Sequence, residues 1–234
     1  MEALDRLAAE PALAALLLDV DGTLAPIVAD PADARVPDGT RSELARLRSR
    51  YGLVACVSGR PAEVARAIVG LPELTYVGEH GLELDPEAAE WAPRVHAFAA
   101  RTGRAFEEKP IAAAFHYRTA PNHEAAKREL EQVAEAAREE GLWTRWGRLV
   151  LEVLPPLEAN KGTAVRHLLT RTGLQRALYA GDDTTDLDGF AALDGLEVAV
   201  RVGVVSPESP AAVRERADVV VESPAQLAEL LARL

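Results

Sequence analysis

The sequence predicts an α/β fold, in which a doubly wound parallel sheet forms the core and a smaller α+β segment is inserted into it. Apolar runs at 16–18, 53–57, 177–180, 198–200 and 219–221 alternate with Ala/Leu/Arg/Glu-rich stretches. Strands and helices that alternate in this way form a parallel sheet with helices on both faces. Residues 82–155 break the alternation. We therefore expect 1–81 and 156–234 to form a catalytic core, and 82–155 to form a cap that sets substrate specificity.

The first strand ends in a pair of aspartates. Residues 16–24 read LLLDVDGTL, so Asp19 and Asp21 follow a short apolar run and precede a glycine. A short apolar run bounded by a turn signal is typical of a buried strand, and open α/β sheets bind ligands at the carboxyl ends of their strands. Two crowded carboxylates repel each other unless a cation neutralises them. A hard cation with oxygen ligands, Mg²⁺ in the simplest case, fits this pattern, although an isolated Asp-x-Asp is usually a solvated turn.

The second strand, 53–57, leads into Ser58, Gly59 and Arg60. Ser58 is placed to cap a helix that begins near Pro61 and to bind an anion at that helix N-terminus, and both roles can hold at once. Arg60 is expected either to lie near a bound phosphate or the helix cap, or to be a surface residue.

Two further motifs follow the inserted segment. Residues 160–163, NKGT, precede a helical stretch, and residues 181–186, GDDTTD, follow the strand at 177–180. Three acids so close together, Asp182, Asp183 and Asp186, would be unfavourable in an apolar protein core. Together with the first pair they are suited to surround one divalent ion, although Asp186 alone is also typical of a helix cap.

These four motifs, in this order, resemble those of the haloacid dehalogenase-like (HAD) phosphatases. The resemblance implies a HAD-like core in which Asp19 is the nucleophile and Asp21 the general acid and base. It implies that Ser58 donates a hydrogen bond to the phosphoryl group and that Lys161 offsets its charge. The implied Mg²⁺ ligands are Asp19, the backbone carbonyl of Asp21, and Asp182. Behind these ligands lie Asp183 and Asp186, and the substrate phosphate is expected to contact Gly22 and Arg60.

The segment between the second and third motifs narrows the family. Residues 76–83 (YVGEHGLE), 107–118 (EEKPIAAAFHYR) and 151–162 (LEVLPPLEANKG) look like those of the trehalose-6-phosphate phosphatases, and the resemblance runs from about residue 14 to 220. It implies hydrolysis of trehalose 6-phosphate through an aspartyl-phosphate, the last step of trehalose biosynthesis. The implied sugar-binding residues are Glu107, Lys109 and Glu152. Glu107 is alternatively a plain surface acid, because Glu108 stands beside it.

Within the inserted segment we expect strands near 82–84, 112–118 and 149–154 and helices near 88–101 and 123–140. His116, Tyr117 and Arg118 end one of these strands, either as core and edge residues or as ligand contacts. His80 lies in the turn that enters the segment, where it either reaches the site or satisfies the turn.

Composition excludes several classes of protein. The 234 residues are 48% hydrophobic but hold no run of eighteen uncharged apolar residues, so no membrane span is expected. The start of the chain does not resemble a secretory signal, and the single cysteine, Cys56, suits a reducing cytoplasm. A net charge of −11 argues against nucleic acid as a partner. We expect a cytoplasmic monomer with a small-molecule substrate.

Three other functions remain open at this point. One is another sugar-phosphate phosphatase, of the sucrose-phosphate or mannosylglycerate-phosphate type. The second is a phosphomutase. The third is a non-catalytic sugar-phosphate sensor, which the presence of Asp19, Asp21 and Lys161 argues against.

Overall fold

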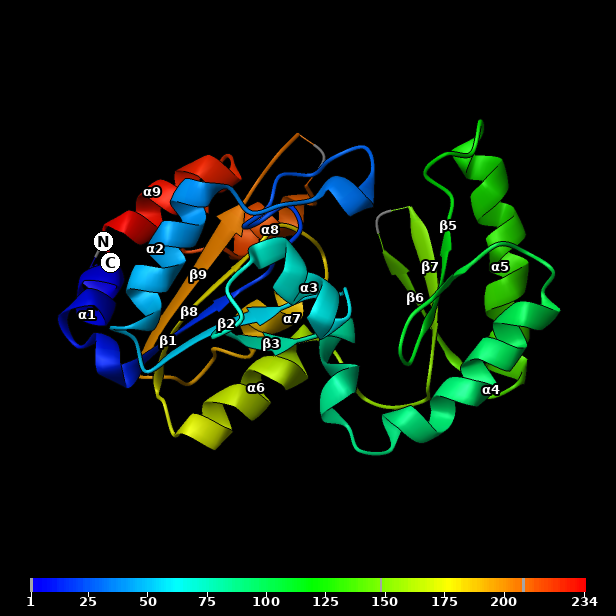
Figure 1. Cartoon of the computed structure of the whole chain (residues 1–234), viewed down its shortest axis with the longest axis horizontal. Coiled ribbons are helices and arrows are strands. Elements are labelled where there is room, and N and C mark those ends of the chain that lie inside the picture. Colours follow the sequence, from blue (N-terminus) through cyan, green and yellow to red (C-terminus); the bar gives the residue numbers. More distant parts are fainter. Residues whose placement is uncertain (1, 148, 208) are drawn as a thin grey trace. The chain divides into compact units, whose positions relative to one another are not determined.

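The computed structural model describes residues 2–147, 149–207 and 209–234, and the chain forms two compact units (Figure 1). The first consists of Met1–Gly81 and Asn160–Leu234, and the second of Leu82–Ala159. We predicted an inserted segment of 82–155, which ends slightly earlier than the second unit. No helix in the described part of the chain has the length and apolar character needed to cross a membrane.

The first unit contains a six-stranded parallel sheet, which confirms the predicted fold class. Its order is β10-β9-β8-β1-β2-β3. The strands are β1 (Ala14–Leu18), β2 (Leu53–Val57), β3 (Thr75–Val77), β8 (Arg176–Gly181), β9 (Val198–Val204) and β10 (Val219–Val221). The chain starts at β1, adds strands on one side, and later returns to pair β8 with the other side of β1. This reversal places the end of β1 at the switch point where doubly wound sheets bind ligands.

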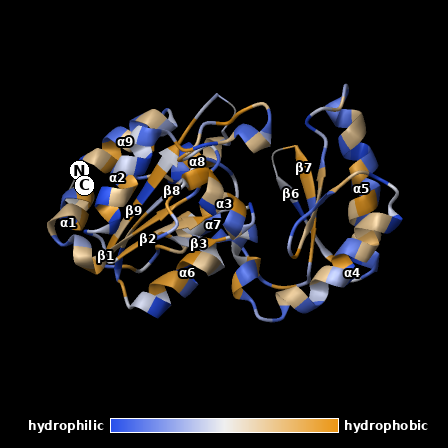
Figure 2. Cartoon of the chain, viewed as in Figure 1, coloured by the Kyte–Doolittle hydropathy of each residue, from blue (hydrophilic) through white to orange (hydrophobic). Residues whose placement is uncertain are grey.

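Helices cover both faces of this sheet (Figure 1). They are α1 (Glu2–Ala9), α2 (Asp38–Arg48), α3 (Ala62–Val69), α6 (Lys161–Thr172), α7 (Asp186–Ala191), α8 (Ala211–Arg216) and α9 (Pro224–Ala232). Apolar side chains of α2, α3 and α9 share one buried cluster with Leu16, Leu18 and Leu178. All five residues of β1 are buried, and Figure 2 shows the core strands as hydrophobic along their length. A strand buried on both faces needs such a continuous apolar run.

The second unit is a four-stranded antiparallel sheet with two helices, and the strand order is β4-β5-β7-β6. Its elements are α4 (Ala88–Arg101), β4 (Glu107–Glu108), β5 (Ala113–His116), α5 (His123–Glu139), β6 (Trp143–Gly147) and β7 (Val150–Leu154). Phe115, Leu151 and Val153 pack with apolar residues of both helices. Because side chains alternate along a strand, Ala114 and Glu152 project from the opposite face of the sheet.

One predicted strand is wrong. Residues Glu79–Leu84 form the 3-10 segment η3, and not a strand near 82–84. Both His80 (φ 57°) and Gly81 (φ 105°) lie in the left-handed region, which extended backbone does not visit. The strands β3, β4 and β6 were not predicted, because none of them shows a clear apolar alternation.

Candidate active site

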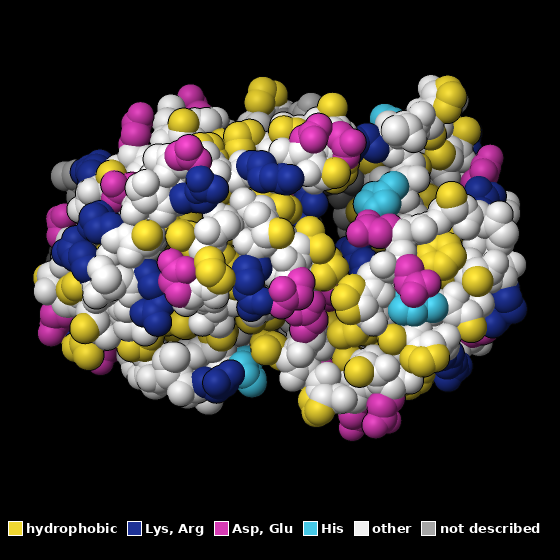
Figure 3. All heavy atoms as spheres, viewed as in Figure 1, with side chains coloured by type: hydrophobic (Ala, Val, Ile, Leu, Met, Phe, Trp, Pro, Cys, Tyr) yellow, Lys and Arg dark blue, Asp and Glu magenta, His cyan; other side chains and the backbone are white. Residues whose placement is uncertain are grey.

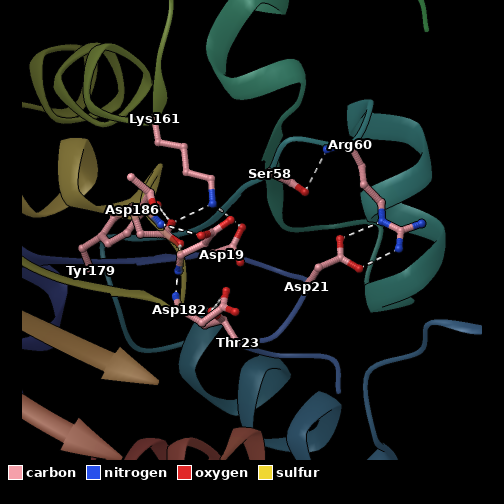
Figure 4. A network of polar contacts seen from close by, with 11 residues as sticks. Asp19, Asp21, Thr23, Ser58, Arg60, Lys161, Tyr179, Asp182 and Asp186 are labelled. Atoms are coloured by element: carbon pink, nitrogen blue, oxygen red, sulfur yellow. Dashed lines mark hydrogen bonds and ion pairs between the residues drawn. The ribbon is translucent and has the colours of Figure 1, made fainter. Parts of the chain in front are cut away.

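Side chains from four separate segments meet beyond the carboxyl end of β1 (Figure 4). Asp19 directly follows β1, Ser58 follows β2, Asp182 follows β8, and Lys161 begins α6. The backbone N–H of Asp19 donates to the carbonyl of Ala180 over 2.9 Å, which extends the β1–β8 pairing as far as the nucleophile candidate. Parallel neighbouring strands thus bring together residues that lie far apart in the sequence.

Lys161 bridges two buried carboxylates. Its Nζ donates to Asp19 Oδ1 over 2.6 Å and to Asp186 Oδ1 over 2.7 Å. Burial alone would lower the pKa of Lys161, but the charges of Asp186 and Asp19 together raise it above its usual value. Lys161 therefore stays protonated. Asn160 caps its helix, since the Asn160 side chain accepts from the Thr163 N–H and Thr163 Oγ1 accepts from the Asn160 N–H.

Asp182 approaches the same cluster from β8. Thr23 Oγ1 lies 3.5 Å from Asp182 Oδ1, and a Cβ added to Gly22 would stand only 2.2 Å from Asp182 Oδ2. Glycine at position 22, with φ 84°, is therefore what allows the first loop to pass over this carboxylate. Burial raises the pKa of Asp19 to about 7 and that of Asp182 to about 9.

This acidic cluster suits a divalent cation. Ligand oxygens of Asp19, Asp182 and Asp186 lie within 4.8 Å of one another. If all three buried carboxylates are ionised, the ammonium of Lys161 balances one negative charge, and a divalent cation would balance the other two. Carboxylate oxygens are the donors that hard divalent cations prefer.

The two oxygens of Asp186 are already occupied by donors from the chain. Oδ1 accepts from Lys161 Nζ and from the Tyr179 hydroxyl, and Oδ2 accepts from the backbone N–H groups of Asp182 and Asp183. A Cβ added to Gly181 would stand 2.2 Å from Asp186 Cγ, so a glycine is required where this carboxylate folds back. Because both oxygens of Asp186 already accept from these donors, Asp186 is less free than Asp19 and Asp182 to hold a metal ion.

The side chain of Asp21 points away from this cluster and toward Arg60 (Figure 4). Arg60 Nε donates to Asp21 Oδ2 over 2.7 Å, and Nη2 donates to Asp21 Oδ1 over 2.6 Å. Arg60 Nη1 also donates to the carbonyl of Pro31. Arg60, predicted to contact the substrate, therefore holds the predicted general acid in this structure.

Ser58 and His80 belong to the neighbouring loops. The buried Ser58 Oγ accepts from the Arg60 N–H over 3.1 Å, whereas α3 begins after Pro61 without a side-chain cap. The prediction that Ser58 caps α3 is therefore wrong. The His80 N–H donates to the Ser58 carbonyl, and its ring lies against Gly59, where an added Cβ would stand 2.5 Å from Nε2. Asp183 is half-buried and its Oδ1 accepts from the Thr184 N–H.

In the second unit, two of the three predicted sugar-binding residues pair with each other. Lys109 Nζ donates to Glu152 Oε1 over 2.5 Å, and both side chains are buried. Glu107 is exposed and lies 2.7 Å from His116 Nε2. In the register of the sheet, Ala114 stands opposite both Glu107 and Glu152, so these acids share one row across the strands. Glu108 instead lies near His96, at 3.7 Å.

The residues that end β5 divide between core and surface. Tyr117 packs against the hydrophobic core of the second unit, and its ring contacts His123 and Trp146 edge-on. His116 is exposed and Arg118 half-buried, with the Arg118 carbonyl 3.0 Å from His123 Nε2.

Sequence reasoning missed two members of the site, Thr23 and Tyr179. Thr23 could have been found, because it belongs to the DGT end of the first motif. Tyr179 lies in an apolar strand, where nothing local indicates that its hydroxyl reaches Asp186. Burial, and then the charge of Asp186, raises the pKa of Tyr179 well above its usual value, so the hydroxyl stays a donor.

Comparisons with known proteins agree on one family. The family model of trehalose-phosphatase matches residues 17–98 and 88–220. The chain is 33% identical over 245 residues to the trehalose-phosphate phosphatase of Mycobacterium ulcerans (strain Agy99), which covers 94% of this chain and 61% of that protein. It is 35% identical over 217 residues to a probable trehalose-phosphate phosphatase of Sinorhizobium fredii, with 84% of this chain and 80% of that one covered. The chain thus spans about 61% of the length of its mycobacterial relatives.

Solved structures support the same fold. The C-terminal domain of C. albicans trehalose-6-phosphate phosphatase matches with a TM-score of 0.75 at 23% identity, over 99% of this chain and 94% of that one. A haloacid dehalogenase-like hydrolase from Bacteroides thetaiotaomicron matches with a TM-score of 0.63 at 16% identity, over 94% and 98%. The family model and the sequence relatives together show that the chain belongs to the trehalose-phosphatase family.

Proposed function

We propose that this chain hydrolyses trehalose 6-phosphate to trehalose and inorganic phosphate, the last step of trehalose formation. The observation that carries the proposal is the buried Asp19 carboxylate, held by Lys161 and close to Asp182 at the end of β1. A buried carboxylate held in this way is fixed in position to attack phosphorus.

In the proposed first step, an oxygen of Asp19 forms a bond to phosphorus while the bond from phosphorus to the sugar oxygen breaks. Asp21 gives its proton to the departing sugar oxygen, and Asp19 is left as an aspartyl-phosphate. In the second step Asp21 takes a proton from water, whose oxygen attacks phosphorus, and the bond to Asp19 breaks. Phosphate leaves and Asp19 is restored.

Lys161 offsets negative charge in both steps. Two of its three ammonium hydrogens are directed at Asp19 and Asp186, which leaves the third for a phosphoryl oxygen. Ser58 is proposed to donate to another such oxygen, and Gly22 to contact the phosphate through its backbone. On the face shown in Figure 3, acidic and basic side chains are interspersed. Because the chain carries a net charge of −11, attraction of an anionic substrate is proposed to come from local groups such as Lys161 and a bound cation.

The divalent cation is proposed to be Mg²⁺, held by the carboxylates of Asp19 and Asp182 and by the Asp21 carbonyl. When bound, it supplies positive charge that lets an anionic nucleophile approach an anionic phosphate. Asp183 and Asp186 are proposed to orient these ligands through their backbone and carboxylate contacts.

Asp21 cannot transfer protons while both of its oxygens accept from Arg60. We therefore propose that substrate phosphate attracts Arg60 and releases Asp21.

In the second unit, Glu107, Lys109 and Glu152 are proposed to bind the sugar, because carboxylates accept from hydroxyl groups and an ammonium donates to them. The buried, unpaired thiol of Cys56 supports a cytoplasmic location, and we propose that the chain acts as a monomer.

The test is phosphate release from a panel of phosphomonoesters, namely trehalose, sucrose, mannosylglycerate and glucose phosphates, with Mg²⁺ and with chelator. Asp19→Asn should be inactive, whereas the matched control Asp38→Asn, an exposed acid paired with Arg41, should behave as wild type. Preference for another sugar phosphate would overturn the substrate assignment, and release in excess chelator would overturn the metal assignment.

A further inference from the structure

We propose that Tyr179 is a positioning residue for Lys161, which it holds in place through Asp186. The inference rests on the proposed function, since it assigns Lys161 to the phosphoryl group. Tyr179 itself is fully buried in β8 and makes its contact with the site through one hydroxyl group.

The hydroxyl and the ammonium share one acceptor. The Tyr179 hydroxyl donates to Asp186 Oδ1 over 2.7 Å, and Lys161 Nζ donates to the same oxygen over 2.7 Å. The same Nζ donates to Asp19 over 2.6 Å. The position of the Lys161 ammonium therefore depends on the competing attractions of Asp19 and Asp186. Because the Tyr179 hydroxyl also donates to Asp186, it weakens the attraction of Asp186 for Lys161.

The ring of Tyr179 is held so that the hydroxyl has a fixed direction. Phe190 packs against it edge-on, with ring centroids 5.9 Å apart. Gly189 lies against the end of the ring, where an added Cβ would stand 2.4 Å from Cζ. Its neighbours in the strand are apolar (Ala177, Leu178 and Ala180), so phenylalanine would fill the same space without burying a hydroxyl. A buried hydroxyl has to be hydrogen-bonded, and here its partner is Asp186.

Removal of the hydroxyl should move the ammonium toward Asp186 and away from Asp19. Asp186 Oδ1 would then keep Lys161 as its one side-chain donor among the described residues. Small misplacements of a group that acts on the transition state are costly in rate. Lys161 acts most strongly once the phosphoryl group is being transferred to Asp19, so the loss should fall on kcat and on binding of mimics of that state, and not on KM.

The first experiment compares Tyr179→Phe with Tyr76→Phe. Tyr76 is a matched control, because its hydroxyl donates over 2.8 Å to the Leu71 carbonyl, away from the site. Tyr179→Phe should lower kcat about ten- to a hundred-fold with KM nearly unchanged, as loss of one hydrogen bond to a charged group predicts. Tyr76→Phe should keep wild-type kcat. A kcat of Tyr179→Phe within about two-fold of wild type, or an equal loss in Tyr76→Phe, would overturn the proposal.

A double-mutant cycle separates positioning from general structural damage. If Tyr179 acts through Lys161, the change Tyr179→Phe should cost almost nothing further in a Lys161→Met background. The same loss in both backgrounds would overturn the proposal. Gly189→Ala, which keeps the hydroxyl but displaces the ring, should reproduce the loss of Tyr179→Phe. This second variant keeps the test decisive if Tyr179→Phe folds poorly.

A binding readout makes the outcome independent of turnover. Beryllofluoride mimics a phosphoryl group on a carboxylate, and its binding to the Mg²⁺-loaded protein can be followed by fluorine NMR. Tyr179→Phe should weaken this binding about ten- to a hundred-fold, and Tyr76→Phe should not. If wild type releases no phosphate from any ester yet shows this difference, the proposed function fails and the role of Tyr179 stands. Equal beryllofluoride binding by wild type and Tyr179→Phe would overturn the role of Tyr179.

Discussion

Replacement of Asp182 by asparagine should make the metal-free protein more stable while it removes activity. Asp182 is buried beside Asp19 and Asp186, and burial is the main reason that its pKa rises to about 9. In the unfolded chain the pKa is near its ordinary value of 3.8. At neutral pH the folded, metal-free protein must therefore hold a proton on Asp182 that the unfolded chain has lost.

The magnitude follows from linkage. One pKa unit corresponds to about 1.4 kcal/mol, so protonation of Asp182 at pH 7 costs the folded state at most about 4 kcal/mol. Asparagine has the same shape and no charge, and it can still accept from Thr23. We expect a gain of about 1–4 kcal/mol in the free energy of unfolding, or about 3–10 °C in Tm for a chain of this size.

The sign of the pH dependence gives a second readout. Because the folded-state pKa is raised, stability is highest below about pH 4 and is lost as pH rises toward about 9. The stability advantage of Asp182→Asn in chelator should therefore be small in acid and grow toward pH 9. Mg²⁺ should raise the Tm of wild type, more so at higher pH, and should leave the variant nearly unchanged.

The assay is thermal unfolding of both proteins between pH 5 and 9, with chelator and with Mg²⁺, alongside phosphate release. Asp38→Asn is the control for loss of one surface acid, and its Tm should follow wild type. An equal or lower Tm for Asp182→Asn in chelator would refute the electrostatic reasoning. A wild-type response of this variant to Mg²⁺ would refute its assignment as a metal ligand.

Three further predictions concern the nucleophile, the sugar contacts and the buried pair. Asp19→Asn should abolish turnover, because an amide cannot form the acyl phosphate, while its Tm in chelator rises for the reason given for Asp182. Glu107→Ala should lower catalytic efficiency on trehalose 6-phosphate about ten- to a hundred-fold and spare p-nitrophenyl phosphate, whereas Lys161→Met should damage both substrates alike. Lys109→Ala should lower the free energy of unfolding by about 3–5 kcal/mol, because it leaves the buried Glu152 without its nearest cation.

Each of these predictions has an outcome that contradicts it. Activity of a few per cent or more in Asp19→Asn would exclude the covalent mechanism. Equal losses of Glu107→Ala on both esters would make this residue structural and not a sugar contact. Denaturant unfolding of Lys109→Ala that matches Glu107→Ala, an exposed residue, would show that the buried pair contributes little to stability.

The sequence by itself determined the fold class and the chain positions of the candidate catalytic residues. Both follow from local patterns: an apolar run marks a buried strand, and the polar residues that end it must lie at the edge of the sheet. Parallel strands share that edge, so the sequence predicts that Asp19 and Asp182 lie together, whereas the role of Ser58 at the phosphoryl group follows from the family resemblance. Lys161, at the start of a helix, was assigned only through the resemblance to the haloacid dehalogenase-like phosphatases.

The tertiary structure decided which of these groups touch. Asp21 pairs with Arg60 from 39 positions away, and Lys109 pairs with Glu152 from 43 positions away. The fold also decided that Asp186 is filled by four donors and that Tyr179 is one of them. Local patterns report which face of an element is buried and where the element ends. They carry no information on which distant side chain satisfies a buried charge, because that depends on loop paths and on the close approaches that glycines such as Gly22 and Gly181 permit.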